Sequence, residues 1–298
     1  MESEELRREG VLVVGETLVD LVPGPDGRLH RHLGGSAANV AVGLARLGRP
    51  VRLWTCLADD ADGRWLAARL DAEGVGLVGD PWVLERTSSA RAVLDDRGVA
   101  TWELDLLWAP AGDPGGPFAA VHTGSLAAVC EPGATTVRAA LADLGTATLR
   151  SFDVNARQPY STAAAVESWL DWPDLVRAST DDLALLWPGT DPVGLARQWF
   201  AAHRRPGTVA ISDGARGAVR VSRHSTDRIP ASEVEVVDTV GAGDAFTAAT
   251  LDGWLRGRGD IEDWTAVLER AVAAASLSVT RAGAAPVTRA DLDGPGSG

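Results

Sequence analysis

Short apolar runs alternate with stretches of helical spacing along much of the chain. Continuous runs of this length are typical of parallel strands that are buried on both faces, and they occur at residues 11–15, 50–54, 119–122, 149–153 and 208–211. Residues 36–47 and 62–73 have helical spacing and are followed by Gly48 and Gly74, residues that favour the end of a helix. This alternation predicts an α/β fold with a mostly parallel sheet and helices on both faces.

Two segments, at about residues 17–33 and 83–109, interrupt the alternation and predict strands and turns without a helix. In the second, residues 90–95 alternate between faces, Asp96-Arg97-Gly98 favours a turn, and an apolar run follows at 99–107. We therefore expect a small β-sheet inserted into one α/β domain that covers residues 1–290. Residues 291–298, rich in glycine, predict a disordered tail.

A glycine-rich turn, residues 238–244, follows an expected strand at 234–237 and precedes an expected helix. The first N–H groups of a helix are unpaired and carry a partial positive charge, and Gly241 and Gly243 allow the backbone to approach an anion closely. A carboxylate repels phosphate, so Asp244 makes chemical sense there as a base that takes the proton of an attacking hydroxyl. On these residues alone, a structural turn in which the helix dipole favours Asp244 is an equal alternative.

A second glycine pair, Gly34-Gly35, precedes the expected helix at 36–47 and would bring its N–H groups close to a ligand. Asn39, one turn into that helix, offers both a donor and an acceptor, which suits the hydroxyls of a sugar. A plain helix entry with small residues for close packing is the alternative from the residues themselves.

Composition excludes several classes of protein. The chain has 298 residues and a net charge of −13, which disfavours nucleic-acid and anionic-membrane partners. It contains no lysine, so cationic side chains at an anion site must be arginines. Two cysteines, Cys56 and Cys130, indicate neither a disulfide framework nor a metal cluster and favour a reducing compartment. With neither a signal peptide nor an apolar run of membrane-spanning length, the sequence predicts a cytoplasmic protein.

The string Asp-Thr-Val-Gly-Ala-Gly-Asp-Ala-Phe at 238–246 resembles the C-terminal signature of the PfkB, or ribokinase-like, carbohydrate kinases. Residues 33–48 resemble the N-terminal signature of the same family, and residues 15–22 resemble its fructokinase-like branch. The resemblance runs from residue 15 to about 286. It implies a doubly wound α/β domain with a small β-sheet lid, to which segments 17–33 and 83–109 would contribute.

The implied activity is transfer of the γ-phosphoryl group of ATP to a hydroxyl of a small sugar, most of all fructose. Ribose, nucleoside and 2-keto-3-deoxygluconate kinases are alternatives, as is a catalytically silent relative that binds a sugar or nucleotide. The implied cofactors are ATP and Mg²⁺, with K⁺ in many relatives. A homodimer formed through the lid is also expected.

The resemblance assigns roles to individual residues of this chain. Asp244 would be the general base, and the anion hole would consist of Gly241, Ala242 and Gly243. Arg157, in Asp-x-Asn-x-Arg at 153–157, would steady the transferred phosphoryl group. The sugar would be bound by Asp20, Gly34, Gly35 and Asn39. The nucleotide would be contacted by Ser212, Gly214, Gly217, Asn155 and Ala275.

Two metal assignments are weaker in the sequence. Ser179 and Asp182 stand where many relatives have Asn-x-x-Glu, so a magnesium contact of Asp182 through water rests on a changed motif. Asp238 belongs to the segment that holds a monovalent cation in many relatives.

The second lid segment bears on the choice of sugar. Relatives that take sugar acids tend to carry Tyr-x-Arg there, whereas this chain has Trp102-Glu103-Leu104-Asp105. Two acids in place of an arginine would repel a carboxylate, so we expect neutral sugars to be preferred. Trp102 and Trp108 are both expected on the lid hairpin, where packing is favoured over stacking on a sugar.

Overall fold

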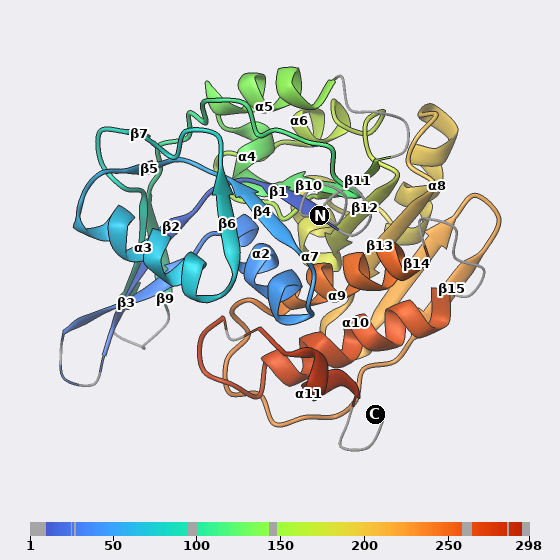
Figure 1. Cartoon of the computed structure of the whole chain (residues 1–298). Coiled ribbons are helices and arrows are strands. Elements are labelled where there is room, and N and C mark those ends of the chain that lie inside the picture. Colours follow the sequence, from blue (N-terminus) through green and yellow to red (C-terminus); the bar gives the residue numbers. More distant parts are fainter. Residues whose placement is uncertain are drawn as a thin grey trace.

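A nine-stranded sheet forms the centre of the molecule in the computed structural model (Figure 1). The structure describes residues 10–24, 26, 28–94, 100–142, 148–257, 264–284 and 286–293. In spatial order the strands are β15 (Thr226–Ile229), β14 (Ala218–Ser222), β13 (Thr208–Ser212), β12 (Leu175–Ser179), β11 (Leu149–Asp153), β10 (Ala120–Gly124), β1 (Val11–Val14), β4 (Val51–Trp54) and β6 (Val75–Val78). The strands from β6 to β13 are parallel, and β14 and β15 continue the sheet antiparallel at one edge.

Helices cover both faces of this sheet, which confirms the expected doubly wound α/β fold. The core on one face includes helices α2 (Ser36–Arg46), α9 (Ala242–Arg256) and α10 (Trp264–Ser278). The core on the other includes α4 (Ser125–Val129), α5 (Gly133–Ala142), α6 (Ala163–Glu167), α7 (Thr180–Leu186) and α8 (Pro192–Ala202). Val11 and Val13 of β1 pack in the first core and Leu12 and Val14 in the second, because side chains alternate along a strand. Across the described residues, none of the helices combines the length and apolarity needed to span a membrane.

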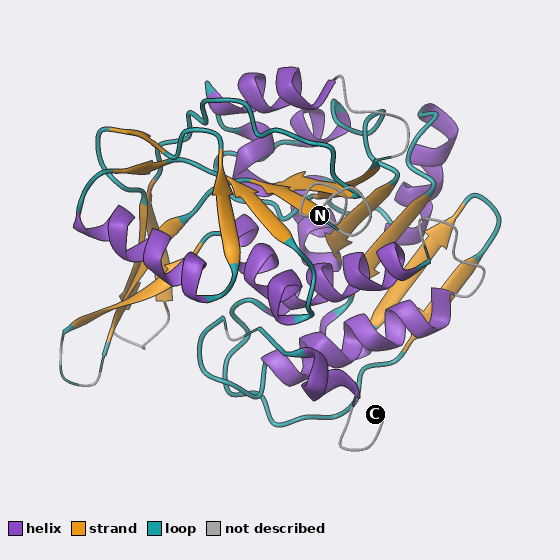
Figure 2. Ribbon diagram, viewed as in Figure 1, coloured by secondary structure: helices purple, strands orange, loops and turns teal. Residues whose placement is uncertain are grey.

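A separate four-stranded sheet, called the lid here, projects from one side of the main sheet (Figure 2). Its strands, in spatial order, are β3 (Leu29–Gly34), β2 (Leu18–Pro23), β8 (Ser89–Leu94) and β9 (Ala100–Asp105). They come from the two segments that the sequence set apart, and β8 pairs antiparallel with β9 as the hairpin pattern predicted. The predicted turn at 96–98 lies outside the described residues. Beside the lid, β5 (Leu57–Ala58) pairs with β7 (Trp82–Leu84), and α3 (Ala61–Ala72) packs against β5 and β6.

The predicted strand at 234–237 is wrong. These residues form a loop in which Val236 and Val237 expose 59% and 60% of their surface. The N–H of Val237 donates to the carbonyl of Val279, at 2.8 Å, just beyond the end of α10. β-branched residues favour strands only where a neighbouring strand offers hydrogen bonds, and this segment lies beyond β15 at the end of the sheet.

Two smaller expectations also need correction. Trp108 lies past the end of β9 and is buried, with its Nε1 donating to the carbonyl of Ala127, so it belongs to the main core and not to the lid. The expected tail begins as a helix, α11 (Arg289–Asp293), because Asp291 pairs with Arg281 and accepts the N–H of Thr288. Residues 294–298 lie outside the described residues.

Candidate active site

A cavity of about 1270 Å³ lies at the carboxyl ends of the parallel strands and extends beneath the lid. Ligands of open α/β sheets bind at this edge. Of the site residues expected from the sequence, all except Gly34 and Asp238 line the cavity. One end is bounded by the lid and α2, and the other by the β13–β14 turn and α10, so the cavity has room for two ligands placed end to end.

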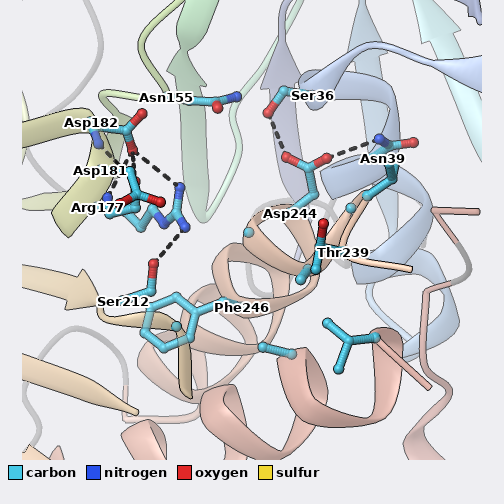
Figure 3. A pocket seen from close by; sticks show the side chains of 18 of the residues that line it. Ser36, Asn39, Asn155, Arg177, Asp181, Asp182, Ser212, Thr239, Asp244 and Phe246 are labelled. Atoms are coloured by element: carbon cyan, nitrogen blue, oxygen red, sulfur yellow. Dashed lines mark hydrogen bonds and ion pairs between the residues drawn. The ribbon is translucent and has the colours of Figure 1, made fainter. Parts of the chain in front are cut away.

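Asp244 lies between these two ends (Figure 3). Its carboxylate accepts hydrogen bonds from Ser36 Oγ at 2.6 Å and from Asn39 Nδ2 at 2.9 Å, both on α2. Burial raises the pKa of Asp244 above its usual range, and the two hydrogen bonds oppose that rise. Asp244 is therefore a partly buried carboxylate whose orientation is fixed by the helix that follows the glycine pair.

The start of α9 has unpaired N–H groups, the feature from which the sequence predicted an anion site. Gly241 has a φ of 77°, and a Cβ there would lie 2.7 Å from the Cβ of Ala284. Both the backbone conformation and the lack of space therefore exclude a side chain. No side chain caps this helix, and the N–H groups of Gly243 and Asp244 have no partner within the described part of the chain. These groups point their partial positive charge at the centre of the cavity.

Asp238 lies outside the cavity and connects two loops. Its Oδ1 accepts the N–H of Val240 and its Oδ2 accepts the N–H of Gly283, at 3.0 and 2.9 Å. It thereby ties the glycine turn to the loop after α10.

The end of the cavity at the lid and α2, where the sequence predicts a sugar and which is called the sugar end here, depends on close packing at the glycine pair. A Cβ on Gly34 would collide with the Asp20 carboxylate, and Gly35, with a φ of 96°, lies against the carbonyl of Glu16. Burial and the nearby Asp244 raise the pKa of Asp20 to about 6. Gly34 therefore shapes the position of Asp20 without lining the cavity itself.

Glu16, which the sequence reasoning missed, also lines the sugar end. Its side chain is almost fully buried, and its Oε1 accepts the N–H of Ser36 at 3.3 Å. Burial raises the pKa of Glu16 to about 7, against the opposing effect of its own backbone hydrogen bond and of Arg157. The available signal was its place directly after a buried parallel strand, where ligand-binding groups gather.

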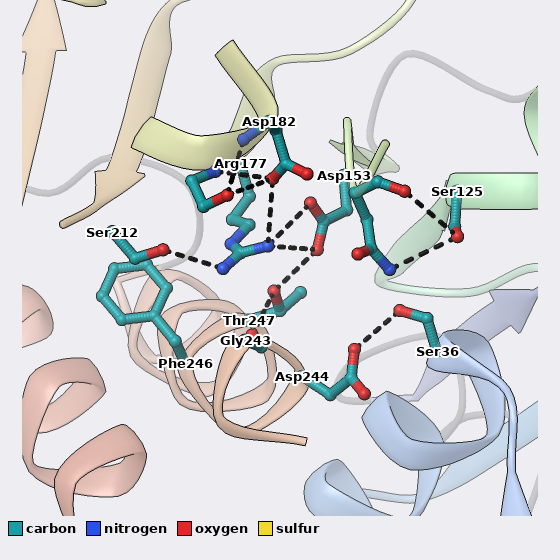
Figure 4. A network of polar contacts seen from close by, with 12 residues as sticks. Ser36, Ser125, Asp153, Arg177, Asp182, Ser212, Gly243, Asp244, Phe246 and Thr247 are labelled. Carbon is teal, nitrogen blue, oxygen red and sulfur yellow. Dashed lines mark hydrogen bonds and ion pairs between the residues drawn. The ribbon is translucent and has the colours of Figure 1, made fainter. Parts of the chain in front are cut away.

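A buried arginine, Arg177 on β12, connects several polar residues beside the start of α9 and was also missed (Figure 4). Its Nη1 lies 3.2 Å from Asp153 Oδ1 and 3.9 Å from Asp182 Oδ2, and its Nη2 donates to Ser212 Oγ at 2.8 Å. The guanidinium is adjacent to Gly243, where a Cβ would come within 2.9 Å of Nη2. The available signal was a charged residue inside an apolar strand, since such a residue must be paired to be buried.

Asp182 is held by the protein on both oxygens. Its Oδ1 accepts the N–H of Ala156, and its Oδ2 accepts the N–H and Oγ of Ser179 in a capping box at the start of α7. One lone pair of Oδ1 is left for a water. Asp181, the preceding residue in the chain, is exposed and also lines the cavity.

Arg157 and Asn155 approach the cavity from the loop after β11. Arg157 donates to the carbonyl of Ala156 and lowers the pKa of Asp244 and Glu16 through its charge. Asn155 has a positive φ of 30°, which Asn adopts more readily than most other residues with a Cβ, and its Nδ2 donates to Ser125 Oγ.

The opposite end of the cavity contains the residues expected to contact a nucleotide. Gly214 and Gly217 both have positive φ values, 52° and 96°, in the turn between β13 and β14. A Cβ on Gly217 would collide with the carbonyl of Ile229. Ala275 lies across from this turn among apolar residues of α10, together with Val272, and this lining suits a flat, uncharged ring.

The lid presents an apolar face to the cavity. Ala90, Trp102 and Leu104 line it, and Trp102 remains 47% exposed. Because side chains alternate along a strand, Glu103 and Asp105 point to the other face, where Asp105 pairs with Arg86. The expectation that these two acids would repel a sugar acid in the site is therefore wrong.

The described residues contain no cluster of three or more His, Cys, Asp or Glu side chains that could hold a metal ion. The acids near the centre fit Mg²⁺ in the manner usual for phosphoryl transfer, with phosphate oxygens and waters supplying most ligands and one carboxylate assisting. The remaining lone pair of Asp182 suits that role.

Comparison with known proteins places these features in a family. Residues 8–290 match the model of the pfkB family carbohydrate kinases. Fructokinase from Klebsiella pneumoniae is 34% identical over 260 residues, which cover 82% of this chain and 83% of that protein.

Two solved structures share the fold along nearly their whole length. A fructokinase double mutant from Vibrio cholerae O395, with fructose, ADP and a potassium ion bound, has a TM-score of 0.76 at 27% identity, covering 93% of this chain and 94% of that one. Aminoimidazole riboside kinase from Salmonella enterica, bound to aminoimidazole riboside and an ATP analog, has a TM-score of 0.75 at 27% identity, covering 95% and 98%.

Proposed function

The chain belongs to the pfkB family of carbohydrate kinases and is a phosphotransferase that acts on a sugar hydroxyl, and we propose that its substrates are ATP and fructose. In this proposal the γ-phosphoryl group is transferred to a primary hydroxyl of the sugar, and Asp244 is the general base. The N–H groups at the start of α9 stabilise the charge on the transferred group, with Arg157 as the side-chain cation.

The placement of Asp244 is the observation that carries the proposal. Its carboxylate lies at the junction of the two ends of the cavity, on the same helix turn as the unpaired N–H groups of Gly243 and Asp244. A hydroxyl bound beside Asp20 and Asn39 would therefore be close both to a base and to a group that stabilises an anion. Holding the hydroxyl, the base and the anion-stabilising N–H groups together in this way favours removal of the proton and transfer of the phosphoryl group at the same place.

Fructose is favoured over the alternatives by the relatives. The Klebsiella pneumoniae fructokinase is among the relatives that are more than 30% identical to this chain. Nucleosides are the second candidate, because the neighbouring riboside kinase shares the fold and because exposed Trp102 on the lid could stack against a flat base. A silent binding protein would have no need for an oriented base such as Asp244.

The cofactors of this reaction are ATP, Mg²⁺ and a monovalent cation. Mg²⁺ would supply charge neutralisation between the phosphates, and Asp182 would orient one of its waters through Oδ1. The monovalent cation is proposed beside Asp238, whose Oδ2 accepts the N–H of Gly283 and so joins the glycine turn to the loop after α10. K⁺ there would strengthen the positive potential at the start of α9.

The setting is proposed to be the cytoplasm, and the assembly a dimer formed through the lid. Cys56 and Cys130 are both buried free thiols, which agrees with a reducing compartment. Strand β3 is one of the two edge strands of the lid and is largely exposed, so it offers unpaired backbone groups to a second copy of the chain.

A panel of sugars with ATP and Mg²⁺, followed by release of ADP, tests the proposed function. We expect sugar-dependent ADP release with fructose giving the highest kcat/KM. If none of the sugars or ribosides accelerates ADP release, the proposed activity is wrong, and a higher kcat/KM with a riboside would favour the second candidate.

A further inference from the structure

Glu16 carries a buried carboxylate oxygen that the protein leaves without a donor. Its Oε1 accepts the N–H of Ser36, whereas its Oε2 is shielded from solvent and has no hydrogen-bond partner among the described residues. Only 3% of the residue is exposed, although it lines the sugar end of the cavity. A buried polar atom without a partner is costly, so its presence beside a binding cavity calls for a ligand.

The surroundings of Glu16 connect it to the reacting centre through a single residue. Ser36 donates its backbone N–H to Glu16 Oε1 and its hydroxyl to Asp244 Oδ1. Glu16 and Asp244 are therefore joined through Ser36 at the N-terminus of α2, and the charge of Asp244 contributes to the raised pKa of Glu16. A substrate that reaches Asp244 is thus within the neighbourhood of Glu16.

We propose that Glu16 is a substrate-binding residue whose carboxyl group turns toward the cavity when the sugar binds, so that Oε2 forms a hydrogen bond with a hydroxyl of the sugar other than the one that is phosphorylated. The proposal rests on the proposed function, since it assumes a polyhydroxyl substrate at this end of the cavity. Asp20 and Asn39 approach from β2 and α2, so Glu16, at the end of β1, gives the site a third direction of contact. The three together would fix the orientation of the sugar and thereby the hydroxyl presented to Asp244.

A hydroxyl suits this position better than other groups. It can both donate and accept, so it can bond to Oε2 in either protonation state of the carboxyl. This matters because burial raises the pKa of Glu16 to about 7, where both states are populated near neutral pH. The charged or titratable groups that act on Glu16 are Arg157 and Asp244, and the thiols of Cys56 and Cys130 sense its charge from the other side. An anionic group would be repelled by Glu16 and Asp244 together.

The test compares wild type with Glu16→Gln, which keeps an oxygen for Ser36 N–H and replaces Oε2 by an amide that can only donate. Glu73→Gln is the matched control, because Glu73 is partly buried, pairs with Arg46 and lies outside the cavity. Dissociation constants are measured at about pH 8 for fructose and for its monodeoxy analogues. Thermal unfolding of each variant checks that it is folded.

We expect Glu16→Gln to weaken fructose binding by roughly 5- to 10-fold at pH 8, because the amide replaces a hydrogen bond to a charged oxygen by a neutral one. One monodeoxy analogue, lacking the hydroxyl that Glu16 binds, should bind wild type and variant within about twofold of each other, as double-mutant logic requires. An unchanged affinity for fructose would overturn the proposal. So would an equal loss for every analogue, because Glu16 would then act by positioning Ser36 and Asp244.

Failure of this proposal is distinguishable from failure of the proposed function. Turnover of fructose by wild type tests the function without reference to Glu16. If another sugar has the highest kcat/KM, its own monodeoxy analogues replace those of fructose in the binding comparison.

Discussion

Replacing Arg177 by Met should destabilise the fold strongly and in a pH-dependent way. Arg177 is 5% exposed, and its guanidinium is the cation that faces Asp153 and Asp182. Met preserves most of the buried volume but removes the charge and the donors. Removing one partner of a buried ion pair costs about 3–5 kcal/mol, because the remaining charge is left without compensation. A domain with about 5–15 kcal/mol of stability should still fold.

The sign of the pH dependence follows from Asp153. Burial raises its pKa from 3.8 to about 6, and Arg177 opposes that rise, so the carboxyl of the variant should titrate still higher. At about pH 5 Asp153 is protonated in the folded forms of both proteins, so the loss of the arginine charge costs the least unfolding free energy. At about pH 8 Asp153 of the wild type is ionised beside Arg177. In the folded variant, Asp153 must either hold a proton at a pH where few are available or stay ionised and buried without a cation. The difference in unfolding free energy should therefore widen as the pH rises from 5 to 8.

Urea unfolding followed by tryptophan fluorescence at both pH values measures this difference. Arg205→Met is the control, because Arg205 pairs with Asp174 at a half-exposed site where an ion pair is worth about 0–1 kcal/mol. The double variant Arg177→Met/Asp153→Asn should recover part of the loss, since it removes the uncompensated carboxylate. A loss below about 1 kcal/mol in Arg177→Met, or the same loss at both pH values, would refute the reasoning.

Three further predictions concern the sugar end. Asn39→Ala and Asp20→Ala should each chiefly raise the sugar KM, because a sugar hydroxyl loses its hydrogen-bond partner. The expected loss of binding free energy is about 1–3 kcal/mol. Unchanged KM values in steady-state kinetics would show that the sugar is held elsewhere. Neutral sugars should have a higher kcat/KM than 2-keto-3-deoxygluconate, because Glu16 and Asp20 line the site; the highest value with the sugar acid would contradict this. Fructose without ATP should change the fluorescence of Trp102, which is 47% exposed on the lid, and Trp102→Phe should abolish the change; no change in an active protein would indicate a rigid, preformed site.

Local patterns in the sequence predicted the parts of the molecule that depend on neighbours along the chain. The buried strands, the lid hairpin and the two glycine turns follow from alternation, from β-propensity and from the need for close backbone approach. The resemblance then placed Asp244 and Asn39, which are 205 residues apart, in one site, and their hydrogen bond of 2.9 Å agrees with that placement. Val234–Val237 misled because β-branched residues form strands only beside a partner strand.

The features that the sequence left out depend on three-dimensional neighbours. The pairing of Arg177 with Asp153 crosses from β12 to β11, so neither residue alone indicates a buried ion pair. Glu16 Oε2 lacks a partner because none of the described residues brings a hydrogen-bond donor to it, which the sequence does not indicate. The strand register of β9 decided that Trp102, and not Glu103, faces the cavity. Side-chain direction of this kind needs the register, which the hairpin pattern alone did not settle.

The most direct test of the account is the effect of Asp244→Asn on turnover and on sugar binding measured in the same protein. The base acts in the transition state, so we expect kcat to fall by roughly 10²-fold or more while the dissociation constant for fructose changes only a few-fold. The acid limb of the wild-type rate profile should lie above the usual range of an aspartate, because burial raises the pKa of Asp244 and protonation removes the base as the pH falls. A variant that retains near-normal kcat would contradict the account, since Asp244 would then not be the base.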